Sequence, residues 1–323
     1  MYGVAWRDKA CLPFSVPARQ KGAKGRFMTQ ILASLAEVSD RYDAVFCDLW
    51  GCVHNGDTPF PAAVAALQAY RGRGGRVVLI TNAPRPKSSV VKQLDRMGCP
   101  RDCWDDVVSS GDAAQYAMLT GAVGRKVYFI GAPQHDSFFT SLSPDLEAVA
   151  AREPKVTLVP LEEAEGCVCT GLVDDFNETP EDYRLTLMQM KNRDLPMLCV
   201  NPDIMVDWGD KRLWCAGALA RDYEAMGGRA FYFGKPHPPI YDLARRRLLA
   251  LDVPPNPEIL CIGDGIATDI QGGMGEDLDT LFITGGLSAD EFGPDVEHPD
   301  PQLLDVWLTG KQMSATYAMG RLR

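Results

Sequence analysis

Ala44-Val-Phe-Cys-Asp48-Leu-Trp-Gly-Cys-Val-His-Asn-Gly56 contains a short apolar run that ends in an aspartate and continues into a turn. Two further runs have the same form, Arg76-Val-Val-Leu-Ile-Thr81 and Glu258-Ile-Leu-Cys-Ile-Gly-Asp264. Continuous apolar runs of this length, separated by helix-length segments, are typical of buried strands in a parallel sheet. The sequence therefore predicts an α/β fold in which Asp48, Thr81 and Asp264 lie beyond the carboxyl ends of the strands, where such sheets bind ligands.

The segments around these runs indicate two helices and an insertion. Helical spacing of apolar residues predicts helices at 61–70 and 87–97. Residues 121–228 contain four more apolar runs, which predict an inserted α/β unit, and we expect the chain to return to the first sheet at 230–235. The tail beyond Asp290 is acidic and contains several prolines, so we expect short irregular pieces there.

Composition limits the classes of function. The chain has 323 residues, enough for about two domains, and its 46% hydrophobic and 24% charged residues are those of a globular protein. A formal net charge of −10 argues against a nucleic-acid partner, and no apolar run reaches the roughly 18 residues that span a bilayer. Cys47, Cys199 and Cys261 lie inside apolar runs, as reduced thiols do, so we expect a cytoplasmic protein.

The first 27 residues differ from the rest, with six Lys and Arg residues against the single acid Asp8. They lack the continuous apolar stretch of a secretory signal, although an acid-poor, arginine-containing leader can also be a targeting peptide. The sequence favours a basic, disordered extension at residues 1–27, with Met28 as an alternative start.

Four motifs follow one another along the chain: Asp48-Leu-Trp-Gly-Cys-Val-His-Asn-Gly56, Thr81-Asn82, Gly234-Lys-Pro236 and Gly263-Asp-Gly-Ile-Ala-Thr-Asp269. In this order they resemble the haloacid dehalogenase (HAD) superfamily. Asn201-Pro-Asp203 and the long insertion resemble its class IIA branch, the NagD-like hydrolases with a C2a-type cap. The resemblance implies a Rossmann-like parallel-sheet core at 28–120 and 229–323, and an inserted α/β cap that determines substrate specificity at 121–228.

The resemblance also implies a metal and a nucleophile. Phosphoryl transfer requires an in-line nucleophile and positive charge around the equatorial oxygens. Asp48 would attack and form an aspartyl-phosphate. Asp48, Asp264 and the main-chain carbonyl of Trp50 would bind Mg²⁺, a cation that prefers oxygen ligands, and Asp269 would ligate it or orient its waters.

The remaining motif residues would hold the substrate. Thr81 and Asn82 would bind phosphate oxygens, and the catalytic Lys235 would offset charge on the phosphate and on Asp48. Asp203 would face the core from the cap. Asp174, Asp175 and Asn177 are polar enough to face the substrate as well. Taken singly, a strand-terminal aspartate is also a common helix cap or turn former.

Trp50 departs from the family pattern. Most phosphatases of the superfamily have an aspartate two residues after the nucleophile, which protonates the leaving group and then activates water. Tryptophan can do neither, and general acid–base catalysis contributes roughly 10² to 10⁴ in rate. His54 is the nearest candidate for a substitute acid because its unperturbed pKa is close to neutrality. The alternative is that His54 is only a polar residue of the turn that ends at Gly56.

Two functional hypotheses follow from these residues. The first is a Mg²⁺-dependent phosphatase that acts on a small phosphorylated metabolite through an aspartyl-phosphate. The second is a binding or regulatory protein that recognises a phosphorylated metabolite but has weak or no catalytic activity, because Trp50 replaces the usual acid. A dinucleotide site at Gly263-x-Gly265 is disfavoured, since the third glycine is missing and Asp264 would repel a pyrophosphate. We expect no membrane partner, and a homo-oligomer through the cap is left open.

Overall fold

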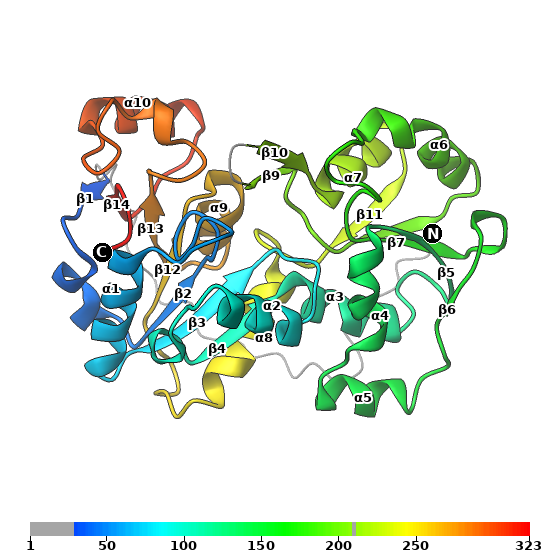
Figure 1. Ribbon diagram of the computed structural model, residues 1–323, viewed down its shortest axis with the longest axis horizontal. Helices are drawn as coiled ribbons and strands as arrows, with labels where there is room; N and C mark the ends of the chain where they lie inside the picture. Colours follow the sequence, from blue (N-terminus) through cyan, green and yellow to red (C-terminus); the bar gives the residue numbers. More distant parts are fainter. Residues whose placement is uncertain (1–28, 209–210) are drawn as a thin grey trace.

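The computed structural model describes residues 29–208 and 211–323, and the predicted basic extension at 1–27 lies outside them. Two parallel sheets form two lobes that lie side by side in Figure 1. The larger sheet contains, in spatial order, β1 (Gln30–Ile31), β14 (Tyr317–Met319), β13 (Asp279–Ile283), β12 (Ile259–Gly263), β2 (Ala44–Cys47), β3 (Arg76–Thr81) and β4 (Asp106–Ser109). The smaller sheet contains β11 (Arg229–Tyr232), β8 (Pro196–Cys199), β7 (Gly166–Cys169), β5 (Lys126–Ile130) and β6 (Thr157–Leu158).

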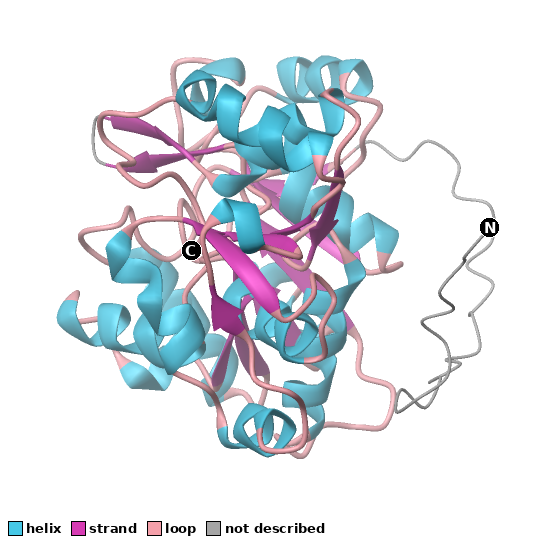
Figure 2. Ribbon diagram, turned by 90° about the vertical axis from the view of Figure 1, so that its right-hand side faces the viewer, coloured by secondary structure: helices cyan, strands magenta, loops and turns pink. Residues whose placement is uncertain are grey.

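Helices cover both faces of the strands, as Figure 2 shows from the side of the smaller sheet. An antiparallel hairpin, β9 (Met205–Trp208) and β10 (Lys211–Trp214), projects from the smaller lobe. None of the helices in the described ranges is long and apolar enough to cross a bilayer. The helices are α1 (Pro61–Gly72), α2 (Lys87–Arg96), α3 (Ser110–Leu119), α4 (Ser137–Thr140), α5 (Pro144–Ala150), α6 (Arg184–Asn192), α7 (Ala216–Ala225), α8 (Pro238–Leu249), α9 (Gln271–Gly275) and α10 (Pro301–Gly310).

Side-chain alternation explains why the central strands are apolar throughout. Val45 in β2 and Val77 in β3 point to one face, where they pack against α1 and α2. Phe46 and Val78, one residue further along each strand, point to the other face and pack against α8. Both faces are therefore buried, as expected for strands between two helical layers.

The chain order of the larger sheet places the predicted site residues together. From β2 the chain first adds β3 and β4 on one side, and later adds β12 and β13 on the other. The strand order therefore reverses between β2 and β12, which pair in parallel. Asp48 follows β2 and Asp264 follows β12, so both lie at this reversal, as the sequence predicts.

The smaller sheet extends further than the sequence indicates. β11 pairs in parallel with β8, so residues 229–232 belong to the smaller sheet, and the return to the larger sheet comes later than the start of the predicted range 230–235. Before the insertion, α3 packs its alanines against the apolar face formed by Val127, Val168 and Leu198 of the smaller sheet. Strands of both sheets are apolar, and so are residues 230–232. The sequence pattern alone therefore does not show which of the two sheets this strand joins.

The C-terminal tail is regular, which corrects the expectation of irregular pieces beyond Asp290. It contains α10 and β14, and β14 lies inside the larger sheet, between β13 and β1. Leu304 and Leu308 of α10 pack on Phe282 of β13. Asp300 caps α10 by accepting hydrogen bonds from the amides of Gln302 and Leu303. The prolines begin elements here and do not prevent them, since Pro301 occupies the first turn of the helix.

We expect Leu304→Ala to lower the free energy of unfolding by about 2–5 kcal/mol, because the side chain is 1% exposed and its removal leaves a cavity. The adjacent Leu303 is 46% exposed, and Leu303→Ala should change the stability by about 0.5 kcal/mol or less. Urea denaturation measures both. Equal effects would contradict the packing of α10.

Candidate active site

The buried ammonium of Lys235 joins two of the predicted carboxylates. Its Nζ lies 2.5 Å from Oδ1 of Asp48 and 2.7 Å from Oδ1 of Asp269, and it also donates to the carbonyl oxygen of Ile80 at 3.3 Å. Asp48 follows β2, Asp269 lies in a π-helical turn after β12, and Lys235 lies between β11 and α8. Three segments far apart in the sequence are thus held at one point.

Burial and charge control the protonation of this group. Burial, and the charge of Asp269, raise the pKa of Asp48 to about 7, although Lys235 lowers it. Burial raises the pKa of Asp264 well above its usual value, and the charges of Asp48 and Asp269 add to this effect. Burial lowers the pKa of Lys235, but the attraction of Asp269 and Asp48 outweighs it and keeps the ammonium charged. Three buried carboxylates therefore face one ammonium.

The donor set fits a divalent cation. Ligand atoms of Asp48, Cys52 and Asp264 lie within 4.8 Å of one another, and both carboxylates are of the hard-oxygen type that Mg²⁺ prefers. Gly51, at φ +73°, lies so close that a Cβ would be 2.0 Å from Oδ2 of Asp264, so the loop can approach the carboxylate only as glycine. A divalent cation would balance the excess of negative charge. Asp269 lies outside this group, with its oxygens on Lys235, the amide of Gly265 and the hydroxyl of Thr268, and its role as a ligand stays a prediction.

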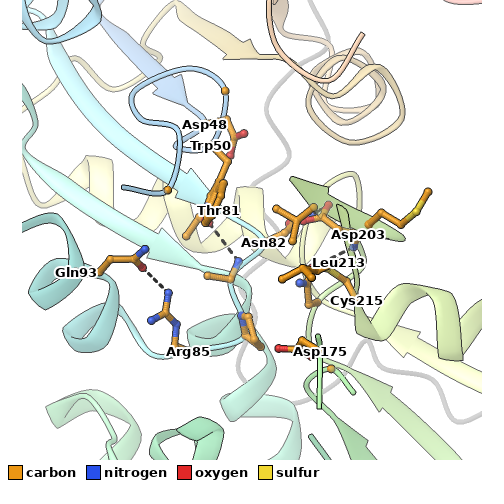
Figure 3. A pocket seen from close by; sticks show the side chains of 18 of the residues that line it. Asp48, Trp50, Thr81, Asn82, Arg85, Gln93, Asp175, Asp203, Leu213 and Cys215 are labelled. Atoms are coloured by element: carbon orange, nitrogen blue, oxygen red, sulfur yellow. Dashed lines mark hydrogen bonds between the residues drawn. The ribbon is translucent and has the colours of Figure 1, made fainter. Parts of the chain in front are cut away.

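Asn82 has a structural task that the sequence does not reveal. Its side-chain oxygen accepts from the amide of Lys235 at 2.7 Å, and its Nδ2 donates to the carbonyl oxygen of Lys235 at 3.0 Å and to Oδ1 of Asp203 at 2.8 Å. Gly234 permits this contact, because a Cβ there would lie 2.4 Å from the Asn82 oxygen. Asn82 thus fixes the backbone of Lys235 and ties the loop after β3 to Asp203 (Figure 3).

These residues open into a cavity of about 890 Å³ between the two lobes. The larger lobe contributes Asp48, Trp50, Thr81, Asn82, Lys235, Asp264 and Asp269. The smaller lobe contributes Thr170, Asp175, Asn201 and Asp203, together with Met205, Val206, Leu213 and Trp214 of the hairpin. Asp175 lines this cavity as predicted, whereas Asp174 and Asn177 do not and instead bond to each other at 2.8 Å. The arrangement encloses a small molecule between the nucleophile and the hairpin.

Trp50 lines the cavity, and His54 does not. The His54 side chain is 1% exposed, and its Nδ1 accepts a hydrogen bond from the amide of Gly56 at 2.9 Å. Burial lowers the pKa of His54 to about 4, and the charge of Arg85 acts in the same direction. Its ring packs edge-on against Trp50, with 5.3 Å between the centroids. This placement favours the alternative, that His54 is a polar residue of the turn, over the role of a substitute acid, because a buried imidazole that accepts the Gly56 amide does not line the cavity and its lowered pKa leaves it neutral at neutral pH.

The sequence did not indicate two parts of this site, the amide of Leu287 and the pair of side chains Arg85 and Gln93. The amide of Leu287 donates to Oδ2 of Asp264 at 3.0 Å, from the loop after β13, a strand that was not predicted. The apolar run Leu281-Phe-Ile283 followed by Gly285-Gly286 is a signal that could have identified it. Arg85 and Gln93 also line the cavity, and no motif includes them.

Comparison with known proteins agrees with this geometry. Family models described as haloacid dehalogenase-like hydrolase and HAD-hydrolase-like match residues 45–142 and 232–307. A solved hydrolase of the haloacid dehalogenase-like family from Brucella suis 1330 is 40% identical, with a TM-score of 0.77, over 90% of this chain and 99% of that one. This protein belongs to the haloacid dehalogenase-like hydrolases. Its smaller lobe and its Asn201-Pro-Asp203 motif agree with class IIA, the NagD-like branch.

Two named relatives in curated sets are more distant. Ribonucleotide monophosphatase NagD of Escherichia coli (strain K12) is 24% identical over 76% of this chain and 88% of its own length. Glycerol-3-phosphate phosphatase of Homo sapiens is 28% identical over 79% of this chain and 82% of its own length. The hydrolase described here is accordingly a phosphatase of the haloacid dehalogenase-like family.

A divalent cation should raise the melting temperature of this hydrolase by about 4 °C at a hundredfold excess over its Kd, because it binds only the folded chain. Asp264→Asn should remove most of that shift, and Asp57→Asn, at an exposed position of the cavity rim, should retain it. Differential scanning calorimetry with and without a chelator measures the shift. An undiminished shift in Asp264→Asn would place the cation elsewhere.

Proposed function

We propose that this hydrolase is a Mg²⁺-dependent phosphomonoester phosphatase that acts on a small phosphorylated metabolite, with Asp48 as the nucleophile. The observation that carries the proposal is the contact of the Lys235 ammonium with both Asp48 and Asp269, beside the Asp264 carboxylate and inside a cavity large enough for a metabolite. A buried carboxylate next to an ammonium and a cation site is the arrangement that phosphoryl transfer requires.

The chemistry follows from these groups. A carboxylate oxygen of Asp48 attacks the phosphorus atom, the bond from phosphorus to the ester oxygen breaks, and an aspartyl-phosphate forms. Water then attacks this phosphorus and releases inorganic phosphate, which restores the carboxylate. Lys235 fixes the rotation of the Asp48 carboxylate and offers positive charge to the transferred oxygens, while Thr81 lies at the end of β3 on the same cavity. A cation bound by Asp48 and Asp264 would supply further positive charge to these oxygens.

Trp50 favours a second candidate, a protein that binds a phosphorylated metabolite and hydrolyses it slowly. Its indole lines the cavity at the position where the family has the acid, and His54 is buried in the turn behind it. The departure Asp48-Leu-Trp-Gly51 leaves binding groups in place and removes proton transfer. Binding and turnover are therefore separable in this chain, and leaving-group chemistry distinguishes the two candidates.

The smaller lobe would act as the cap. It contributes the hairpin and Asp203 to the cavity, so it can select the substrate. A cytoplasmic location fits the nine cysteines of the described residues, which are all buried free thiols, since disulfides are rare in reducing compartments.

Asp48→Asn should reduce phosphate release by 10³ or more, because the change is nearly isosteric and removes the nucleophile. Asp57→Asn removes an exposed carboxylate from the rim of the same cavity, and its rate should stay within a few-fold of the native rate. Phosphate release from a panel of phosphomonoesters, with Mg²⁺ and with chelator, measures both variants. Native turnover in Asp48→Asn, or in excess chelator, would exclude the proposed chemistry.

Leaving-group chemistry tests the role of Trp50. Nitrophenyl and acyl phosphates, whose leaving groups need no proton, should be hydrolysed about 10² or more times faster than alkyl or sugar phosphates, because the indole of Trp50 cannot donate the proton that an alkyl leaving group requires. Trp50→Asp should accelerate alkyl esters most, and its melting temperature must be measured alongside since the indole leaves a cavity. His54→Ala should affect both substrate classes equally. A native rate that does not depend on the leaving-group pKa would contradict this account of Trp50.

A further inference from the structure

Arg85 is a cation of the cavity that the proposed chemistry does not use. It lies in the loop between β3 and α2, three residues after Asn82, and it lines the same cavity as Asp48 and Lys235. Its hydrogen-bond partner is the side-chain oxygen of Gln93 in α2, as Figure 3 shows. This partner is neutral, so it does not balance the charge of the guanidinium.

Within the described part of the chain, no carboxylate forms an ion pair with Arg85. Burial lowers the pKa of Arg85, and the charge of Arg96 lowers it further. The field of Arg85 in turn contributes to the low pKa values of His54 and His135. Partial desolvation of a guanidinium is unfavourable, and an anion bound in the cavity would compensate it.

A side cavity of about 540 Å³ adjoins the main one at this point and shares Arg85, Arg96 and Gln134 with it. Lys92 adds a third cation to its wall. The acid in this wall, Asp95, is already engaged by Arg101, which contacts both of its oxygens at 2.5–2.6 Å. The side cavity is therefore cationic, in a chain whose net charge is −10.

The backbone that carries Arg85 is held in place from α3. The amide of Gly111 donates to the carbonyl oxygen of Ala83 at 3.1 Å, and the carboxylate of Asp112 accepts from the amide of Lys87 at 3.1 Å. Gly111 must be glycine here, because a Cβ would lie 2.6 Å from the carbonyl oxygens of Pro84 and Arg85. The guanidinium is thus positioned before any ligand arrives, which reduces the entropic cost of binding.

We infer that Arg85, with Arg96 and Lys92, forms a second anion subsite, and that the substrate is a phosphomonoester with a second anionic group, a phosphate or a carboxylate, at its far end. This inference rests on the proposed function, since it assumes that the scissile phosphate lies at Asp48 and Lys235. The main cavity joins the two cationic regions, so one elongated dianionic molecule can reach both. A planar guanidinium binds phosphate or carboxylate through two parallel hydrogen bonds, which gives selectivity for such groups.

Binding of stable phosphonates tests the subsite without turnover. Straight-chain alkane bisphosphonates of three to six carbons are compared with monophosphonates of the same chain length, by calorimetry with Mg²⁺ present. At the best length the native protein should bind the bisphosphonate tenfold or more tighter. Arg85→Gln and Arg85→Met should remove that advantage, and Arg85→Lys should retain part of it. Bisphosphonates with one end replaced by a carboxylate distinguish the two kinds of anion.

The control is Arg73→Gln, which removes an exposed arginine that lines neither cavity and should retain the bisphosphonate advantage. Arg85→Met should also melt at or above the native temperature, because it removes a charge without a counter-ion, whereas a structural arginine would lower it. Equal binding of both ligands by the native protein, or an advantage that survives in Arg85→Met, would overturn the subsite alone. Failure of every phosphonate to bind in the presence of Mg²⁺ would overturn the proposed function and the subsite together.

Discussion

The contact of one buried ammonium with two buried carboxylates is the constraint on which this structure depends. Lys235 reaches Asp48 and Asp269 from a loop that leaves the smaller sheet, so the contact fixes how the two lobes meet. Removing the ammonium would leave buried carboxylates without a counter-charge, which is strongly destabilising. Much of the surrounding structure holds these groups in place: Asn82 clamps the Lys235 backbone, Gly51 and Gly234 allow close approach, and the strand reversal brings β2 next to β12.

The same group explains why catalysis and binding can diverge in this chain. In the proposed function, phosphate and metal would be recognised by charges fixed at the strand ends, whereas proton transfer would depend on the side chain at position 50. Replacing that side chain with an indole preserves the turn, because Trp50 packs on His54 and close against Gly56. Substrate selectivity would depend on a third set of residues, the hairpin of the smaller lobe and Arg85 on the loop after β3, which line the same cavity.

The sequence could predict those residues of the site that come directly after the ends of strands. Asp48, Thr81 and Asp264 were predictable because continuous apolar runs stop at them, and parallel strands end at one edge. β11 was not assignable, because an apolar run does not indicate which of two parallel sheets it joins. α10 was missed because the prolines that precede and begin it resembled loop signals, and β14 because a strand of three residues is too short to show a pattern. The sequence left two roles open for His54, because its burial is decided by the turn and not by its residue type. Arg85 carries no local pattern, and only the fold shows that no carboxylate of the described chain faces it.

The account makes Asp48 the nucleophile and leaves the second half-reaction without its usual base, so the aspartyl-phosphate should accumulate. The most direct measurement is rapid acid quench of the native protein with nitrophenyl phosphate and Mg²⁺, followed by mass spectrometry of its peptides. We expect one phosphoryl group on the peptide that contains Asp48, at a substantial fraction of the enzyme, and none in Asp48→Asn. Turnover with no phosphoryl group on that peptide, or with one on another residue, would contradict the account.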